Sequence, residues 1–158
     1  MIEKGKISQE PFIEILKTLE EAESANLVDW NAMNIASVDQ MNQPSSRMVL
    51  LKKISDDGLV FYTNYNSRKG KEIELNPKVA VNFWWRELKK QIRVEGFIEK
   101  ASEEDSDDYF NSRPLKSRVS AIISNQSSMI SSYEDLTNQI DNYLEQNDES
   151  SIKRPDHC

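Results

Sequence analysis

The 158-residue chain is long enough for one domain with a hydrophobic core, and 30% of its residues are charged. A formal net charge of -7 argues against a general nucleic-acid or anionic-membrane binder, whose surface would be broadly basic. The single cysteine, Cys158, excludes an internal disulfide framework and a cysteine cluster for zinc, so we expect a cytoplasmic protein without a metal site. Neither a signal-peptide core nor a membrane-length apolar run is present, which favours a soluble protein.

The first two thirds of the chain predict one helix followed by strands. Apolar residues from Phe12 to Ala22 follow helical spacing, and Pro11 suits a first turn, which predicts an amphipathic helix over residues 11–25. Short runs of branched and aromatic residues favour an antiparallel barrel or sandwich. The predicted strands cover residues 32–38, 47–54, 59–62, 79–85 and 91–100.

Capping signals place the remaining helices. Ser67 can start a short helix that Asn76 and Pro77 end. Ser102 precedes three acidic residues at the start of a helix that runs to about Asn111, and Pro114 can begin the next helix. Ser131 and Glu134 form a capping box for a last helix that ends near Glu145.

Positive charge is concentrated in residues 47–71, which contain six cations and two acids, a local balance of +4. Ser67, Arg68 and Lys69 at a helix start suit a phosphate, although a basic turn of this kind is more often solvated surface. Arg47 and Lys52 lie five positions apart in one predicted strand and so should point to opposite faces. Both can serve one ligand only at a strand edge, a barrel rim or a subunit boundary.

Several residues could also have purely structural or surface roles. Trp84 and Trp85 are adjacent in a predicted strand, so one should lie in the core and the other at an interface. Gln91 could pair only through its backbone, and Tyr109 could be a helix residue that anchors the barrel. The charges of Lys116 and Arg118 are expected at the surface, and His157 is expected to lack a partner in a polar tail.

Six segments together resemble the pyridoxine (pyridoxamine) 5'-phosphate oxidases, which are flavoproteins of the FMN-binding split-barrel fold. They occur in family order from about Pro11 to His157. The resemblance implies a mainly β protein, a Greek-key antiparallel split barrel with peripheral helices, in a single domain 1–158 with flexible tails at 1–10 and 146–158. The segments are NAMNIASVD, PSSRMVLLK, GLVFYTNYNSRKGKEIELNP, VNFWWRELKKQIRVEGFIEK, YFNSRPLKSRVSAIISNQS and RPDH.

The resemblance also implies the site residues and a homodimer that holds FMN between its subunits. The substrate would be held by Lys52, Tyr109, Arg113 and Ser117, with Arg113 and Ser117 suited to its phosphate. The implied FMN contacts are Arg47, Met48, Val49, Leu50, Leu51, Lys52, Tyr62, Thr63, Arg68, Lys69, Gln91, Gln126 and Ser127.

The implied activity is that of an oxidoreductase in pyridoxine biosynthesis and vitamin B6 salvage. It oxidises pyridoxine or pyridoxamine 5'-phosphate to pyridoxal 5'-phosphate, with O2 as electron acceptor and H2O2 released. The family pattern continues after RPDH with two strands, a flavin-contacting Trp and Arg, and an Arg-Leu-His segment at the substrate. This sequence ends at Cys158, so no catalytic residue is assigned.

Two alternatives stay open. One is a split-barrel protein that binds FMN or pyridoxal 5'-phosphate with little or no oxidase activity. The other is a flavin reductase with a nicotinamide donor, for which the chain offers no dinucleotide fingerprint.

Overall fold

The computed structural model describes residues 2–158 and divides the chain into two compact units. The first, here called the sheet unit, comprises Met1–Tyr62 and Glu72–Glu99. The second, the helical unit, comprises Thr63–Lys71 and Lys100–Cys158. Each unit has its own buried apolar cluster, so each is described by itself.

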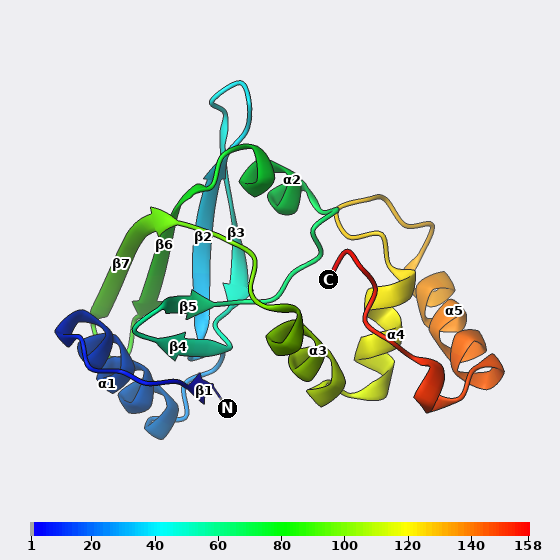
Figure 1. Ribbon diagram of the computed structural model, residues 1–158, viewed down its shortest axis with the longest axis horizontal. Helices are drawn as coiled ribbons and strands as arrows, with labels where there is room; N and C mark the ends of the chain where they lie inside the picture. The colour runs from blue at the N-terminus through cyan, green and yellow to red at the C-terminus, as the bar shows by residue number, and fades with distance from the viewer. Residues whose placement is uncertain (1) are drawn as a thin grey trace. The chain divides into compact units, whose positions relative to one another are not determined.

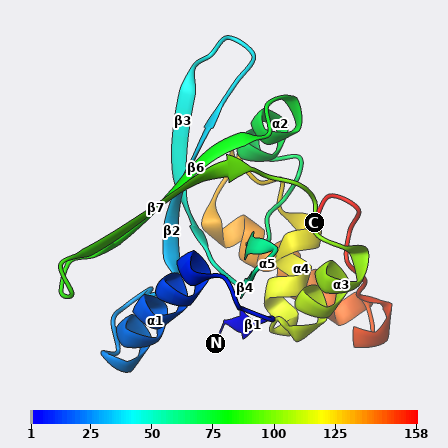
Figure 2. The ribbon, with the colours of Figure 1, turned by 60° about the vertical axis from the view of Figure 1, so that its left-hand side comes forward.

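A four-stranded antiparallel sheet dominates the sheet unit (Figure 1). Side chains alternate between a buried and a more exposed face, as period-two strands require. The tips of the β2–β3 and β6–β7 hairpins project in different directions (Figure 2). In sheet order the strands are β3 (Pro44–Leu50), β2 (Ala32–Val38), β6 (Lys78–Trp85) and β7 (Lys90–Phe97).

A second, smaller sheet completes the unit. β1 (Glu3–Lys4) pairs parallel with β4 (Lys53–Ser55), and β4 pairs antiparallel with β5 (Gly58–Val60). The β4–β5 turn lies at the predicted position, where Gly58 adopts a φ of 145°, a conformation that side-chain-bearing residues rarely take. The fold is therefore antiparallel except at β1, which the sequence did not predict because its two residues carry no apolar alternation.

Helix α1 (Glu10–Ser24) closes the core of the sheet unit. Its first turn contains Pro11, as predicted, and its buried face includes Ile15, Leu19 and Ala22. These side chains belong to one cluster with residues of both sheets, such as Ile54 and Phe83. Burial of this continuous apolar surface is the main stabilising contribution in the unit.

The helical unit contains α3 (Glu103–Ser112), α4 (Leu115–Ile123), α5 (Tyr133–Gln146) and the short 3-10 helix η1 (Glu149–Ser151). Phe110, Val119 and Ile152 form its buried centre. Ser102 caps α3 by accepting a hydrogen bond from the Asp105 backbone N–H at 3.0 Å, as predicted. α2 (Arg68–Leu75) begins in this unit and ends in the sheet unit.

Several predicted boundaries are wrong; for example, the strand predicted over residues 91–100 ends at Phe97. The strand predicted over residues 47–54 is two strands, because β3 ends at Leu50 and β4 begins at Lys53. The alternation argument for Arg47 and Lys52 therefore fails, since the chain leaves the strand between them. The cap of α5 is Ser132, whose Oγ accepts from the Asp135 backbone N–H at 3.0 Å, and not Ser131.

Two polar residues near the C-terminal end of the chain also differ from expectation. Arg118 is buried and forms an ion pair with Glu149, because it lies on the inner face of α4 beside Val119. His157 has partners: its Nε2 lies 3.2 Å from Ala121 O, and its carbonyl accepts from the Tyr65 backbone N–H at 2.6 Å. Flexible tails stay a prediction, but the burial of Ile2 and Ile152 counts against them.

Within residues 2–158, no helix is long and apolar enough to span a membrane. The same residues bring together no group of three or more His, Cys, Asp or Glu side chains able to hold a metal ion.

Candidate functional site

The start of α2 is built around Ser67. Its side chain is fully buried and its Oγ accepts from the Gly70 backbone N–H at 3.2 Å, which caps the helix as the sequence predicts. The same hydroxyl donates to Asn64 O at 2.6 Å and accepts from Lys69 Nζ at 3.2 Å. Ser67 therefore fixes both the first turn of the helix and the ammonium group of Lys69.

Five of the predicted FMN residues meet at this helix start, within the helical unit. Lys69 Nζ donates to Gln126 Oε1 at 2.6 Å, and Thr63 Oγ1 lies 3.5 Å from the same oxygen. The Arg68 backbone N–H donates to Ser127 Oγ at 3.3 Å. The loop after α4, some 60 residues further along the chain, thus completes a cluster of cations, amides and hydroxyls, here called the α2 cluster.

The loop that supplies Gln126 and Ser127 is exposed. Ser127 has a φ of 71°, in the left-handed region, which turns the loop sharply at this residue. Met129, two positions further on, is fully exposed.

The predicted FMN residues of β3 lie in the sheet unit and divide between two faces. Met48 and Leu50 are exposed, Val49 is half-buried, and Leu51 is fully buried in the core. Lys52 lies between β3 and β4, where its backbone N–H donates to Val60 O at 2.8 Å. Tyr62 is half-buried after β5, and Gln91 is exposed on β7 opposite Trp84.

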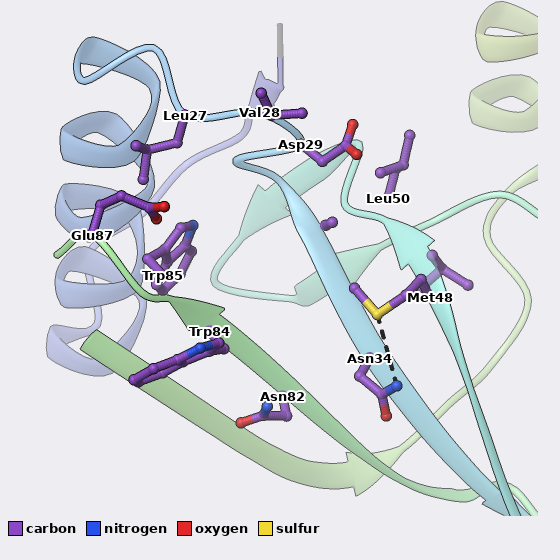
Figure 3. A pocket seen from close by; sticks show the side chains of 12 residues that line it. Leu27, Val28, Asp29, Asn34, Met48, Leu50, Asn82, Trp84, Trp85 and Glu87 are labelled. Atoms are coloured by element: carbon purple, nitrogen blue, oxygen red, sulfur yellow. Dashed lines mark hydrogen bonds between the residues drawn. The ribbon is translucent and has the colours of Figure 1, made fainter. Parts of the chain in front are cut away.

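The exposed face of the large sheet contains a pocket of about 640 Å³ (Figure 3). Trp84 and Met48, exposed by 58% and 61%, line it together with Leu50, while Trp85 is buried. This confirms that one of the paired tryptophans belongs to the core. Asn82 Oδ1, also in the lining, is buried and has no hydrogen-bond partner among the described residues.

Arg47, another predicted FMN residue, lies in the sheet unit. Its guanidinium donates to Ser37, Ser45 and Glu72 in the sheet unit. Sequence reasoning missed Glu72, which is almost fully buried, because a charged residue in a short polar helix is ordinarily expected to face solvent.

Three of the four predicted substrate residues lie at the junction of α3 and α4. The Arg113 guanidinium carbon is 5.9 Å from the centre of the Tyr109 ring, in a cation–π arrangement. Ser117 lies one turn into α4, where its backbone N–H donates to Pro114 O at 2.8 Å. Burial raises the pKa of Tyr109, and the nearby charge of Arg113 opposes that rise. Lys52, the fourth residue, belongs to the sheet unit.

The Cys158 thiol is half-buried, and burial raises its pKa above the ordinary value while the charges of Arg113 and Arg154 lower it. The thiol is therefore protonated at neutral pH and carries no sign of nucleophilic activation.

The fold is shared with solved split-barrel proteins. One is PhzG from Burkholderia lata, crystallised with tetrahydrophenazine-1-carboxylic acid, with a TM-score of 0.86 and 25% identity over 95% of this chain and 73% of that one. Another is a Nostoc punctiforme protein described as pyridoxamine 5'-phosphate oxidase-related and FMN binding, with a TM-score of 0.65 and 17% identity over 83% and 73% of the two chains. The class is therefore the FMN-binding split barrel, as expected.

Sequence similarity then identifies the family within this fold class. The family described as pyridoxamine 5'-phosphate oxidase matches residues 19–143. A pyridoxine/pyridoxamine 5'-phosphate oxidase of a Nostoc species is 47% identical over 152 residues, 96% of this chain and 71% of its own length. A second such oxidase, from Hydrogenovibrio crunogenus, is 41% identical over 98% of this chain and 73% of its own length. The chain belongs to the pyridoxamine 5'-phosphate oxidase family.

The residues present fit FMN, the cofactor that the fold implies. A phosphate needs positive charge and hydrogen-bond donors, and the α2 cluster places the cationic side chains of Arg68 and Lys69 at the positive end of a helix dipole. The unpartnered Asn82 Oδ1 and the apolar side chains near it suit a partner that is both apolar and able to donate a hydrogen bond.

Proposed function

We propose that this chain oxidises pyridoxine 5'-phosphate or pyridoxamine 5'-phosphate to pyridoxal 5'-phosphate, as a step of vitamin B6 salvage. Its cofactor is FMN, and the proposed electron acceptor is O2. The observation that carries the proposal is the 47% identity to a curated oxidase over 96% of the chain. The packing of Arg113 over Tyr109, at positions that the family resemblance assigns to the substrate, supports it.

The proposed reaction balances with O2 for the alcohol substrate and with O2 and water for the amine substrate. Bound FMN supplies the redox chemistry, which removes a hydride equivalent from C4' of the substrate and passes two electrons to O2. The alcohol and O2 give the aldehyde and H2O2. The amine, O2 and water give the aldehyde, ammonia and H2O2.

In this proposal, the protein's own residues bind and orient FMN and the substrate. The side chains of Arg68 and Lys69 at the start of α2 neutralise and hold the FMN phosphate, while Gln126 fixes Lys69 through their 2.6 Å hydrogen bond. Arg113 receives the substrate phosphate through its planar fork of N–H groups, and the Ser117 hydroxyl adds a donor. Lys52 contributes a further positive charge to the substrate.

Peroxide release tests the proposal. FMN-loaded protein supplied with pyridoxamine 5'-phosphate should release H2O2 and pyridoxal 5'-phosphate in equal amounts. Bound flavin without turnover would instead support the alternative of a binding protein. Bleaching of the flavin by NADH would support a flavin reductase.

The proposal includes a homodimer that uses the exposed face of the large sheet. Trp84, Met48 and Leu50 place large apolar side chains together around the pocket, and a contiguous exposed apolar surface is typical of a protein interface. A cytoplasmic location stays a prediction.

Light scattering after gel filtration tests the dimer. Trp84→Glu should convert a dimer to a monomer, because a charge would be buried without a partner. Leu75→Glu is the matched control, since Leu75 is a 57% exposed apolar residue of α2 that does not line the pocket. A wild-type monomer, or dimers of equal stability in both variants, would contradict this use of the sheet face.

A further inference from the structure

Glu72 lies at the centre of a hydrogen-bonded network in the sheet unit. Its side chain is only 5% exposed, and its Oε2 accepts from Ser37 Oγ and Ser45 Oγ, each at 2.6 Å, and from Arg47 Nη2 at 2.9 Å. A carboxylate so far removed from water is stable only where charged and hydrogen-bonding partners replace the water. Glu72, Ser37, Ser45 and Arg47 therefore act as one unit, here called the Glu72 network.

Each serine in the Glu72 network contacts both charges. Ser37 Oγ accepts from Arg47 Nη1 at 2.6 Å, and Ser45 Oγ accepts from Arg47 Nη2. A hydroxyl has one hydrogen, and both serines donate theirs to the carboxylate, so the direction of every bond is set by an ionised Glu72.

The Glu72 network fixes the guanidinium of Arg47 from three elements, β2, β3 and α2. A guanidinium has five N–H groups, and the network uses three of them. The remaining two, on Nε and Nη1, are held at defined orientations that point in different directions, and the side chain keeps 21% exposure. An arginine fixed in advance loses less rotamer entropy when it binds an anion than one that is free to move.

We infer that Glu72 is a positioning residue for FMN, and that it holds Arg47 so that one of the two remaining N–H groups faces the FMN phosphate. The inference rests on the proposed function, in which Arg47 contacts FMN. It adds a role for Glu72, Ser37 and Ser45, which no motif of the sequence assigns.

Loss of the Glu72 charge has two opposed effects. Removal of a negative charge favours an anion, whereas release of the guanidinium disfavours it. We expect the second effect to dominate, because an N–H···O hydrogen bond weakens steeply when its angle departs from linear, so a released guanidinium binds the phosphate less well. Glu72→Gln should therefore raise the Kd for FMN about tenfold, a coupling of ordinary size for a charged network.

Flavin titrations of the purified apoprotein test the inference, with riboflavin beside FMN because riboflavin lacks the phosphate. Glu72→Gln should weaken FMN binding about tenfold and change riboflavin binding by less than about twofold. Glu74→Gln is the matched control, since it removes the same charge from an exposed position of the same helix and should change neither affinity. In an Arg47→Ala background, Glu72→Gln should have no further effect on FMN.

Other outcomes overturn the inference. Equal weakening of both flavins would mean a structural role, and unchanged or tighter FMN binding would mean that Arg47 needs no positioning. If Glu72→Gln does not fold, Ser45→Ala tests the inference instead, because it keeps both charges. It should weaken the binding of FMN by about threefold and leave the binding of riboflavin unchanged. A wild-type protein that binds neither flavin would overturn the proposed function as well. Failure of the proposed function can thus be distinguished from failure of the inference about Glu72 alone.

Discussion

At the scale of single residues, Lys69 shows how side chains far apart in the sequence define one site. Its ammonium lies 3.2 Å from Ser67 Oγ and 2.6 Å from Gln126 Oε1. The neighbouring Arg68 is exposed and places a second cation at the same helix start. Two cations at the positive end of a helix dipole make a favourable environment for a dianion.

Arg68→Ala combined with Lys69→Ala should weaken FMN binding by at least about a hundredfold, because each charge-assisted hydrogen bond contributes about 1.5–3 kcal/mol. Fluorescence titration measures the affinity, and circular dichroism checks that the fold is intact. Lys71→Ala removes an exposed cation from the same helix and should change the affinity little. Unchanged affinity in the double variant would refute the assignment.

Arg113→Ala should raise the KM for pyridoxine 5'-phosphate at least tenfold and leave the Kd for FMN nearly unchanged, because the proposal places this guanidinium on the substrate phosphate. Steady-state kinetics and flavin titration measure the two constants. Lys116→Ala, which removes an exposed cation paired with Asp141 at 2.7 Å, serves as the control. Equal effects on substrate and FMN would argue against the substrate role.

At the scale of elements, the start of α1 depends on a residue from another element. Asp56, in the β4–β5 turn, accepts hydrogen bonds from the backbone N–H groups of Ser8 and Gln9 at 2.8–3.0 Å and from the Ser8 hydroxyl at 2.5 Å. These bonds, first that of the Ser8 hydroxyl, hold the pKa of Asp56 below its ordinary value. The turn thus fixes where the N-terminal segment enters the helix.

Asp56→Asn should lower the melting temperature at neutral pH, because the ionised carboxylate is the better acceptor. A lowered pKa in the folded state stabilises the fold above the ordinary aspartate pKa of about 3.9, and that contribution is lost as the pH falls through the folded-state value. The difference between wild type and variant should therefore shrink in acid. Thermal melts from neutral pH downward check this, and a constant difference would contradict it.

The sequence could predict the elements whose pattern is local. β2 has the predicted bounds, and Ser67 and Ser102 cap the predicted helices, because alternation and capping depend on adjacent residues. The break between β3 and β4 could not be predicted, since the apolar run continues through Leu51 into the core. Glu72 and Arg118 were missed because the burial of a charge depends on partners distant in the sequence.

At the scale of the whole molecule, the chain passes between its two units three times, and α2 contains one of the crossings. Each unit has its own core, with Phe83 fully buried in one and Phe110 buried in the other. Because a helix is cooperative along its length, disorder in one unit should loosen the other. This favours the predicted single domain as the unit of unfolding.

Phe83→Ala and Phe110→Ala should each destabilise the protein by about 3–5 kcal/mol, the usual cost of an emptied aromatic site. In a single domain, both substitutions shift the same transition in urea, followed by fluorescence and circular dichroism. Two separate transitions, each sensitive to one substitution, would show that the sheet unit and the helical unit unfold independently.

Oxidation of Met129 should report the proposed activity. Thioethers in open solvent are readily converted to sulfoxides by oxidants such as hydrogen peroxide. Met129 is fully exposed in the loop that contains Gln126 and Ser127. Hydrogen peroxide released by the proposed oxidase would therefore slowly oxidise the Met129 thioether. The peptide that contains it should gain about 16 Da in protein that has turned over, and the extent of this damage would report how much substrate each preparation has consumed.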